Sequence, residues 1–190
     1  MYILRTLAVL ALTLVTAGLA SAAELPGDSL YRLDLTLTDH HGRHFTLAAR
    51  RGRPQLVSMF YTSCQYVCPL IIDTLKKTQA ALTPAERARL DVLLVSFDPA
   101  RDTPARLAAV FGERKLDAGT WTLARTGPGE VRTLAAALDI QYRALESGDI
   151  NHSSALVLLD RDGRLRARTD RIGEVDADFV AAVKQALAAP

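Results

Sequence analysis

The chain has 190 residues, of which 49% are hydrophobic and 23% are charged, and its formal net charge at pH 7 is +2. This length and composition are typical of one soluble globular domain, and the chain is too short for two domains of ordinary size. The low net charge and the interspersed basic and acidic residues argue against nucleic acid as a partner.

The first 23 residues have the pattern of a secretory signal peptide. Arg5 precedes an apolar run from Leu7 to Ala17, and Ala20-Ser21-Ala22 forms a small-residue cleavage site. We therefore predict a signal peptide over residues 1–23 and an exported, periplasmic domain over residues 24–190. An uncleaved signal anchor is the alternative, because the apolar stretch approaches the about 20 residues that span a bilayer.

Hydrophobic periodicity, turn residues and helix-capping residues predict strands that alternate with helices from residue 33 onward. In chain order we expect a β-hairpin (33–37 and 44–47), a buried strand (55–61), a helix (68–82), a short capped helix from Thr83, a strand (90–97), a helix (102–113), a strand (121–124), a helix (128–138), a short strand (140–145), a second hairpin (154–159 and 165–169) and a closing helix (176–189).

This order predicts an α/β domain with a central mixed sheet flanked by helices and with an N-terminal β-hairpin. The buried strand at 55–61 leads directly into Cys64 and Cys68, and a helix follows. A strand that feeds a cysteine pair at a helix start is the arrangement of the thioredoxin fold, which is the predicted fold class. Without an exposed apolar stripe in the pattern, the expected state is a monomer.

Cys64 and Cys68 are the only cysteines of the chain. A disulfide that closes so short a loop contributes on the order of 2 kcal/mol, so a structural role is a weak reason for the pair. The start of a helix favours thiolate, which is both the nucleophile of disulfide exchange and a ligand for soft metals. Dithiol oxidoreductases favour a two-residue spacer, and the three-residue spacer here lowers the weight of that function without excluding it.

The donor set favours copper over zinc. Structural zinc requires four protein ligands, whereas Cu(I) accepts two thiolates and an imidazole. The histidine candidates are His40, His41, His44 and His152. The first three cluster in a predicted polar turn. His152 lies in a polar loop just before the strand at 154–159, and in a thioredoxin fold this loop faces the cysteine helix. We therefore expect Cys64, Cys68 and His152 to bind copper.

Three motifs in the same order resemble the SCO/SenC family of thioredoxin-fold copper chaperones. They are Tyr61-Thr62-Ser63-Cys64-Gln65-Tyr66-Val67-Cys68-Pro69, the segment from Val95 to Pro104, and Asn151-His152-Ser153-Ser154. The resemblance covers about residues 28–188 and implies copper, as Cu(I) or Cu(II), on Cys64, Cys68 and His152. It further implies copper delivery to the binuclear copper site of cytochrome c oxidase subunit II, or maturation of that site, with a periplasmic copper donor.

The chain departs from the family pattern in its cleavable N-terminus and in Gln65, which follows Cys64 where a proline is usual. Two other functions stay open: a thiol–disulfide oxidoreductase that uses Cys64 and Cys68 as catalytic residues, and a copper or redox sensor. The sequence therefore leaves open whether the protein is an enzyme. Asp98 and Asp102 either begin the following helix or shape the metal site.

Overall fold

The computed structural model describes residues 24–189, and the predicted signal peptide lies outside them. The strands are β1 (Thr36–Asp39), β2 (His44–Thr46), β3 (Gln55–Phe60), β4 (Asp91–Ser96), β5 (Trp121–Arg125), β6 (Tyr142–Ala144), β7 (Ile150–His152), β8 (Leu156–Leu159) and β9 (Leu165–Thr169). The helices are α1 (Val67–Ala80), α2 (Pro84–Arg87), α3 (Pro104–Glu113), α4 (Val131–Ala137) and α5 (Ala177–Ala188), with short 3-10 helices η1 (Leu30–Arg32) and η2 (Leu47–Arg50).

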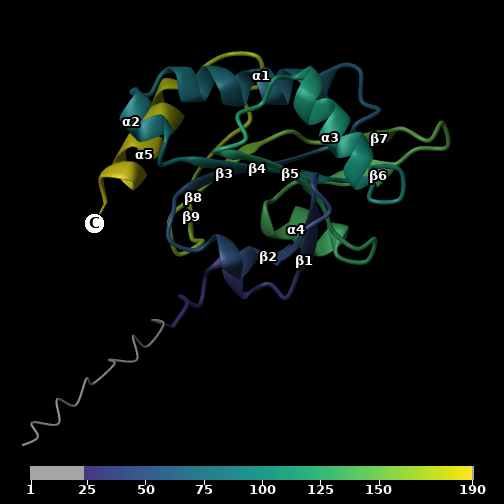
Figure 1. The fold of residues 1–190 in the computed structure, drawn as a ribbon, viewed down its shortest axis with the longest axis horizontal. Coiled ribbons are helices and arrows are strands. Elements are labelled where there is room, and N and C mark those ends of the chain that lie inside the picture. The colour runs from purple at the N-terminus through teal and green to yellow at the C-terminus, as the bar shows by residue number, and fades with distance from the viewer. Residues whose placement is uncertain (1–23, 190) are drawn as a thin grey trace, which may run out of the picture.

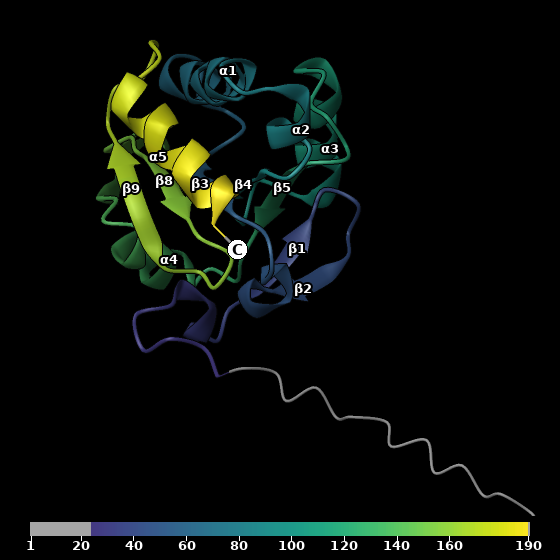
Figure 2. The ribbon, with the colours of Figure 1, turned by 90° about the vertical axis from the view of Figure 1, so that its left-hand side faces the viewer.

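The main sheet has the strand order β2-β1-β5-β4-β3-β8-β9, with β2 and β9 at its two edges (Figure 2). Its centre is parallel, because β3 pairs with β4 and β4 with β5 in that sense. β1 and β8 join this centre antiparallel, which makes the sheet mixed as predicted. Helices α1, α3 and α5 cover one face and α4 covers the other (Figure 1).

Burial on both faces explains the long apolar runs of the central strands. All six residues of β3 and all four residues of β8 are buried, and β4 is buried from Val92 onward. Each fully buried Leu or Val side chain stabilises the fold by about 1.5–3 kcal/mol relative to exposure. The central strands therefore form a firm support for the loops at their carboxyl ends.

The predicted capping residues lie at the starts of helices α2 and α3. Thr83 and Glu86 form the predicted capping box at the start of α2. Thr103, and not Asp102, is the N-cap of α3: its side chain accepts a hydrogen bond from the backbone N–H of Arg106, and Pro104 occupies the first turn. Asp102 is therefore available for other contacts.

Two histidines differ from the prediction. His40 lies in a turn as predicted, but it is buried, because the backbone N–H of His40 continues the pairing of β1 with β5 by donating to the Leu123 carbonyl at 2.9 Å. This pairing places the His40 ring against Phe111 of α3, with the ring centroids 4.1 Å apart. His152 was expected in a loop, yet it is the last residue of β7, where it pairs with Tyr142 of β6.

The β6–β7 hairpin is a two-stranded sheet of its own and extends beyond the main sheet (Figure 1). Gly148 turns the hairpin with a φ of +85°, a conformation that favours glycine. An isolated two-stranded hairpin is marginally stable, so its position depends on contacts with the rest of the domain. Among residues 24–189, no helix combines the length and the hydrophobicity needed to cross a bilayer.

Candidate metal centre

The two cysteines lie where β3 passes into α1. β3 ends at Phe60, a loop carries Cys64, and Cys68 is the second residue of α1. Pro69 fits this first turn because its missing N–H would have no partner there. Cys68 is 2% exposed and Cys64 is partly buried, and both are free thiols.

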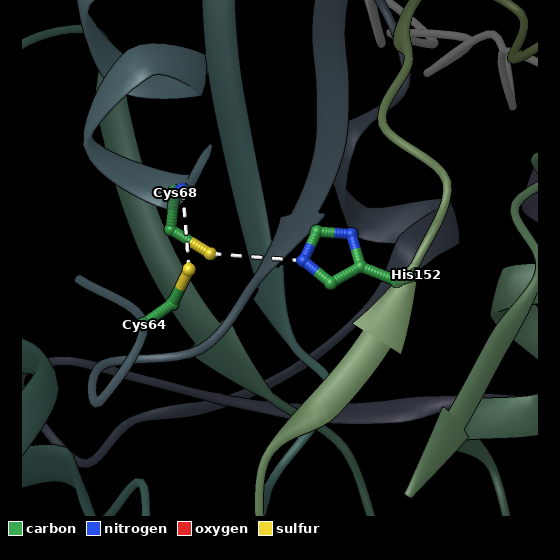
Figure 3. Close-up of side chains that lie close together, drawn as sticks. All are labelled: Cys64, Cys68 and His152. Atoms are coloured by element: carbon green, nitrogen blue, oxygen red, sulfur yellow. Dashed lines mark hydrogen bonds between the residues drawn. The ribbon is translucent and has the colours of Figure 1, made fainter. Parts of the chain in front are cut away.

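The predicted trio converges in space. The sulfur of Cys68 lies 3.9 Å from Nε2 of His152, and the backbone N–H of Cys68 donates to the sulfur of Cys64 at 3.3 Å (Figure 3). The three donor atoms all lie within 4.8 Å of one another. Three donors spread evenly around one metal at about 2.3 Å are about 4.0 Å apart, so a movement of less than about 1 Å would bring all three onto one ion.

His152 presents the correct ring nitrogen to the cysteines. Its Nδ1 lies 3.0 Å from the carbonyl oxygen of Ser153. Because a carbonyl only accepts hydrogen bonds, Nδ1 carries the proton and Nε2 keeps its lone pair directed toward Cys68. A second hydrogen bond of this type commonly orients a histidine ligand. The rings of Phe97 and Tyr61 border the imidazole, with centroid distances of 4.7 and 6.0 Å.

The surroundings shift the pKa values of these groups in different directions. Burial opposes ionisation of Cys64, but backbone hydrogen bonds from Cys68, Tyr66 and Val67 outweigh it and lower the pKa of this thiol. Burial raises the pKa of Cys68 far above its usual range. Burial also lowers the pKa of His152, against the hydrogen bond with Ser153 that favours its charged form. The surroundings therefore favour the thiolate form of Cys64, the thiol form of Cys68 and the neutral form of the His152 imidazole.

The other three histidines do not join this centre. Among the described residues, the only group of three potential metal ligands is Cys64, Cys68 and His152. His40 directs Nδ1 to the Leu123 carbonyl at 3.3 Å, and His44 bonds to Thr38 through Nδ1 at 3.0 Å. Of the candidates from the sequence, only His152 lies beside the cysteines.

The two aspartates form separate contacts next to the centre. Asp102 is 1% exposed, and its carboxylate accepts hydrogen bonds from Thr62 and Ser96. Asp98 forms an ion pair with Arg101. Neither carboxylate belongs to the group of three potential metal ligands.

Sequence reasoning missed Tyr61, Phe97 and Arg101. The Tyr61 hydroxyl accepts a hydrogen bond from the backbone N–H of Ile150 at 3.4 Å, and so links the cysteine loop to β7. Burial is the main cause that raises the pKa of Tyr61. Tyr61 and Phe97 each follow the last residue of a central strand, so aromatic residues at the carboxyl ends of strands were the available signal.

Comparisons with known proteins show the family of the chain and its fold. The SCO1/SenC family model matches residues 24–188. A protein of Stutzerimonas stutzeri, described by its name as copper-binding, is 31% identical over 137 residues, which are 70% of this chain and 65% of that protein. The chain thus spans just under two thirds of the length of this relative.

Two solved structures show the same fold. Bradyrhizobium japonicum ScoI, solved with copper bound, is 24% identical with a TM-score of 0.66 and covers 80% of this chain and 96% of its own. The second structure is BsSco, which is described as a member of the Sco family of cytochrome c oxidase assembly proteins and as having a disulfide switch. It is 20% identical to this chain with a TM-score of 0.72, and the match covers 88% of this chain and 99% of the BsSco chain. These likenesses confirm the thioredoxin-like fold, and with the family match they establish that the chain belongs to the SCO1/SenC family.

Proposed function

We propose that this protein is a copper metallochaperone that binds one copper ion through Cys64, Cys68 and His152 and passes it to another protein. The observation that carries the proposal is the convergence of two sulfurs and one imidazole nitrogen within 4.8 Å. This is a soft donor set of the kind that Cu(I) prefers, and the imidazole also suits Cu(II). The copper-binding description of the Stutzerimonas relative and the copper-bound ScoI structure support the choice of metal.

Each donor has a distinct part in binding and release. Cys64 offers a thiolate at the partly exposed side of the centre, so an incoming thiolate from a partner can replace it first. Cys68 is buried, so it would be the last of the three ligands to release copper. Copper would displace the proton of the Cys68 thiol earlier, when the metal is loaded. His152 supplies a neutral nitrogen and adds no charge. Stepwise exchange of ligands would then transfer copper without releasing it to water.

For the recipient, we propose the binuclear copper site of cytochrome c oxidase subunit II, or another copper-accepting protein. The support is membership of the SCO1/SenC family and the description of BsSco as a cytochrome c oxidase assembly protein. Export to the periplasm, loading by a periplasmic donor and action as a monomer complete the proposal. The export pattern of residues 1–23 is its basis in the sequence.

A second candidate is thiol–disulfide exchange, which the lowered pKa of Cys64 favours. The Cys64 thiolate would attack a partner disulfide, form a mixed disulfide and release one partner thiolate. Cys68 would then lose its proton and attack the Cys64 sulfur, forming the Cys64–Cys68 disulfide and releasing the second partner thiolate. The partner gains two electrons and the cysteine pair loses them. The same pair could also serve a copper or redox sensor.

Copper titration of the reduced protein beside His152→Ala tests the leading proposal. The parent should bind one copper per chain, and its Cu(II) form should show a thiolate-to-copper absorption band. His152→Ala should lose that band and weaken Cu(II) binding by about tenfold or more, with a smaller loss for Cu(I). Equal affinities in parent and variant would contradict the role of His152. A parent that binds no stoichiometric copper but rapidly reduces a test disulfide would favour the second candidate.

A further inference from the structure

The loop between β4 and α3, residues 97–103, lies between the two parts of the candidate centre. One part is the cysteine loop after β3, and the other is the β6–β7 hairpin that ends at His152. These two parts are distant in sequence, so their relative position depends on contacts that bridge them. The β4–α3 loop makes such contacts on both sides.

On the cysteine side, the bridge is the buried carboxylate of Asp102. It accepts hydrogen bonds from the backbone N–H of Thr62 at 3.1 Å and from the Thr62 hydroxyl at 2.5 Å. The Ser96 hydroxyl donates a third hydrogen bond at 2.5 Å. Among the described residues no cation pairs with Asp102, so these donors are what stabilises the buried charge. Thr62, two residues before Cys64, is therefore held in one place.

On the histidine side, the bridge is Arg101. Its guanidinium pairs with the carboxylate of Asp98 and donates to the carbonyl oxygen of Gly148 at 2.5 Å. Gly148 is the turn residue of the hairpin that carries His152. Asp98 fixes the direction of the guanidinium, and Arg101 fixes the tip of a hairpin that has little stability alone.

An aromatic contact completes the histidine side. The Phe97 ring packs against Tyr142 and His152, with centroid distances of 5.3 and 4.7 Å. Phe97 is itself 4% exposed, and its backbone N–H donates to the Phe60 carbonyl at 2.8 Å. The hairpin is thus held at its base by Phe97 and at its tip by Arg101.

We propose that Asp102 and Arg101 are the positioning residues that set the distance between the cysteine pair and His152. Asp102 places the cysteine loop through Thr62, and Arg101 places the hairpin through Gly148. This inference rests on the proposed copper site. Neither residue contributes an atom to the group of three donors, so each acts through the segment that it holds. Loss of an outer hydrogen bond to a metal site commonly weakens binding by 10- to 100-fold, which makes the effect measurable.

Thr62→Val and Arg101→Ala separate the two parts. Thr62→Val keeps the size of the side chain and removes the hydroxyl bonded to Asp102, so we expect about tenfold weaker binding of both Cu(I) and Cu(II) and a shifted thiolate-to-Cu(II) absorption band. Arg101→Ala frees only the hairpin, so we expect about tenfold weaker Cu(II) binding and a smaller change for Cu(I).

A double-mutant cycle gives the decisive comparison. In a His152→Ala background the hairpin no longer brings a ligand, so Arg101→Ala should have no further effect on copper affinity. Thr62→Val should keep its full effect in the same background. Interaction energies of this kind identify residues that act through a shared partner. Asp102→Asn serves as the conservative variant: its amide oxygen can accept from Ser96 and the Thr62 N–H, and its NH₂ can donate to the Thr62 hydroxyl, so copper affinity should stay near that of the parent.

Two control variants match these changes. Ser63→Ala removes an exposed hydroxyl one residue further along the same loop, and Arg106→Ala removes an exposed guanidinium from α3. Both should bind copper as the parent does, and thermal unfolding should show that every variant is folded.

Failure of this inference and failure of the proposed function would give different experimental results. Parent-like copper affinity and absorption in Thr62→Val and Arg101→Ala would overturn the inference alone. An Arg101→Ala effect that persists without His152 would overturn the placement of His152 by Arg101. Loss of binding in Asp102→Asn would show that charge, and not position, is what matters. A parent that binds no copper would overturn the proposed function and this inference with it.

Discussion

The backbone N–H of Cys68 donates a hydrogen bond to the sulfur of Cys64 across 3.3 Å, so the first turn of α1 stabilises one thiolate while it buries the other thiol. The two cysteines are four residues apart in sequence, yet their pKa values shift in opposite directions. Burial alone would raise both. The difference arises because Cys64 faces three backbone N–H groups at the helix start.

This difference predicts selective alkylation of the reduced, metal-free protein. Cys64 should react with iodoacetamide at a pH below the about 8.5 at which an ordinary thiol is half ionised. Cys68 should react much more slowly over the same range. Peptide mass spectrometry after timed quenching measures both rates, and Cys68→Ser gives the Cys64 rate alone because it keeps the backbone N–H. Equal rates at the two cysteines would contradict the asymmetry.

His152→Ala should leave disulfide exchange unchanged, because that reaction requires only the two thiols. We expect the rate of reduction of a small test disulfide to stay within about twofold of the parent, a difference of about 0.4 kcal/mol in barrier. His44→Ala, which removes an exposed histidine away from the centre, is the control. A large loss of rate in His152→Ala alone would show that the imidazole takes part in thiol chemistry.

Tyr66 should contribute to partner docking and not to folding. It lies between the two cysteines and is 84% exposed, so a protein that reaches them must approach past it. Tyr66→Ser should change the free energy of unfolding by no more than about 0.5 kcal/mol. It should slow copper transfer to a soluble oxidase subunit II domain but leave transfer to a small chelator unchanged. Equal slowing in both reactions would place the effect on copper release.

Asp39 should make stability depend on pH in the acid range. Burial of Asp39 acts to raise its pKa, but hydrogen bonds from Arg43 and His41 outweigh burial and lower it. Because the folded-state pKa is the lower one, this stabilisation is present above the unfolded value of about 3.9 and is lost as the pH falls through the folded-state pKa. Asp39→Asn should lose about 1 kcal/mol at pH 7 and respond less to acid.

Urea unfolding at a series of pH values measures this dependence. Asp34→Asn, at an exposed position nearby, is the control and should follow the parent at every pH. An Asp39→Asn curve parallel to that of the parent through the acid range would contradict the prediction.

Gly163→Ala should be strongly destabilising. Gly163 has a φ of +81°, and a Cβ atom there would lie 2.6 Å from ring atoms of the buried Tyr31. Strain and overpacking together should cost about 2–4 kcal/mol. Gly42 has the same φ of +81° but nothing within 4 Å of the added atom, so Gly42→Ala should cost only about 1 kcal/mol. Urea unfolding compares the two, and similar losses would show that contact with Tyr31 is not the cause.

The order of the elements and the candidate metal ligands could be predicted from the sequence alone. Continuous apolar runs mark β3, β4 and β8 because these strands are buried on both faces. Thr83 with Glu86, and Thr103 with Pro104, mark helix starts because capping is a local interaction between neighbours in sequence. The cysteine pair could be proposed from its donor chemistry. His152 could be proposed from its place before the strand at 154–159 in the expected fold and from the family resemblance.

How these residues come together could not be read from the sequence, because it depends on contacts between distant segments. The 3.9 Å approach of His152 to Cys68 joins positions 84 residues apart, and no local pattern specifies it. Burial of His40 followed from the pairing of β1 with β5, which turns a polar residue of the expected hairpin toward α3. The contacts of Asp102 with Thr62 and of Arg101 with Gly148 likewise join separate segments. Periodicity and capping report local backbone geometry, whereas a metal centre is a long-range contact that exists only once the sheet and its loops are packed.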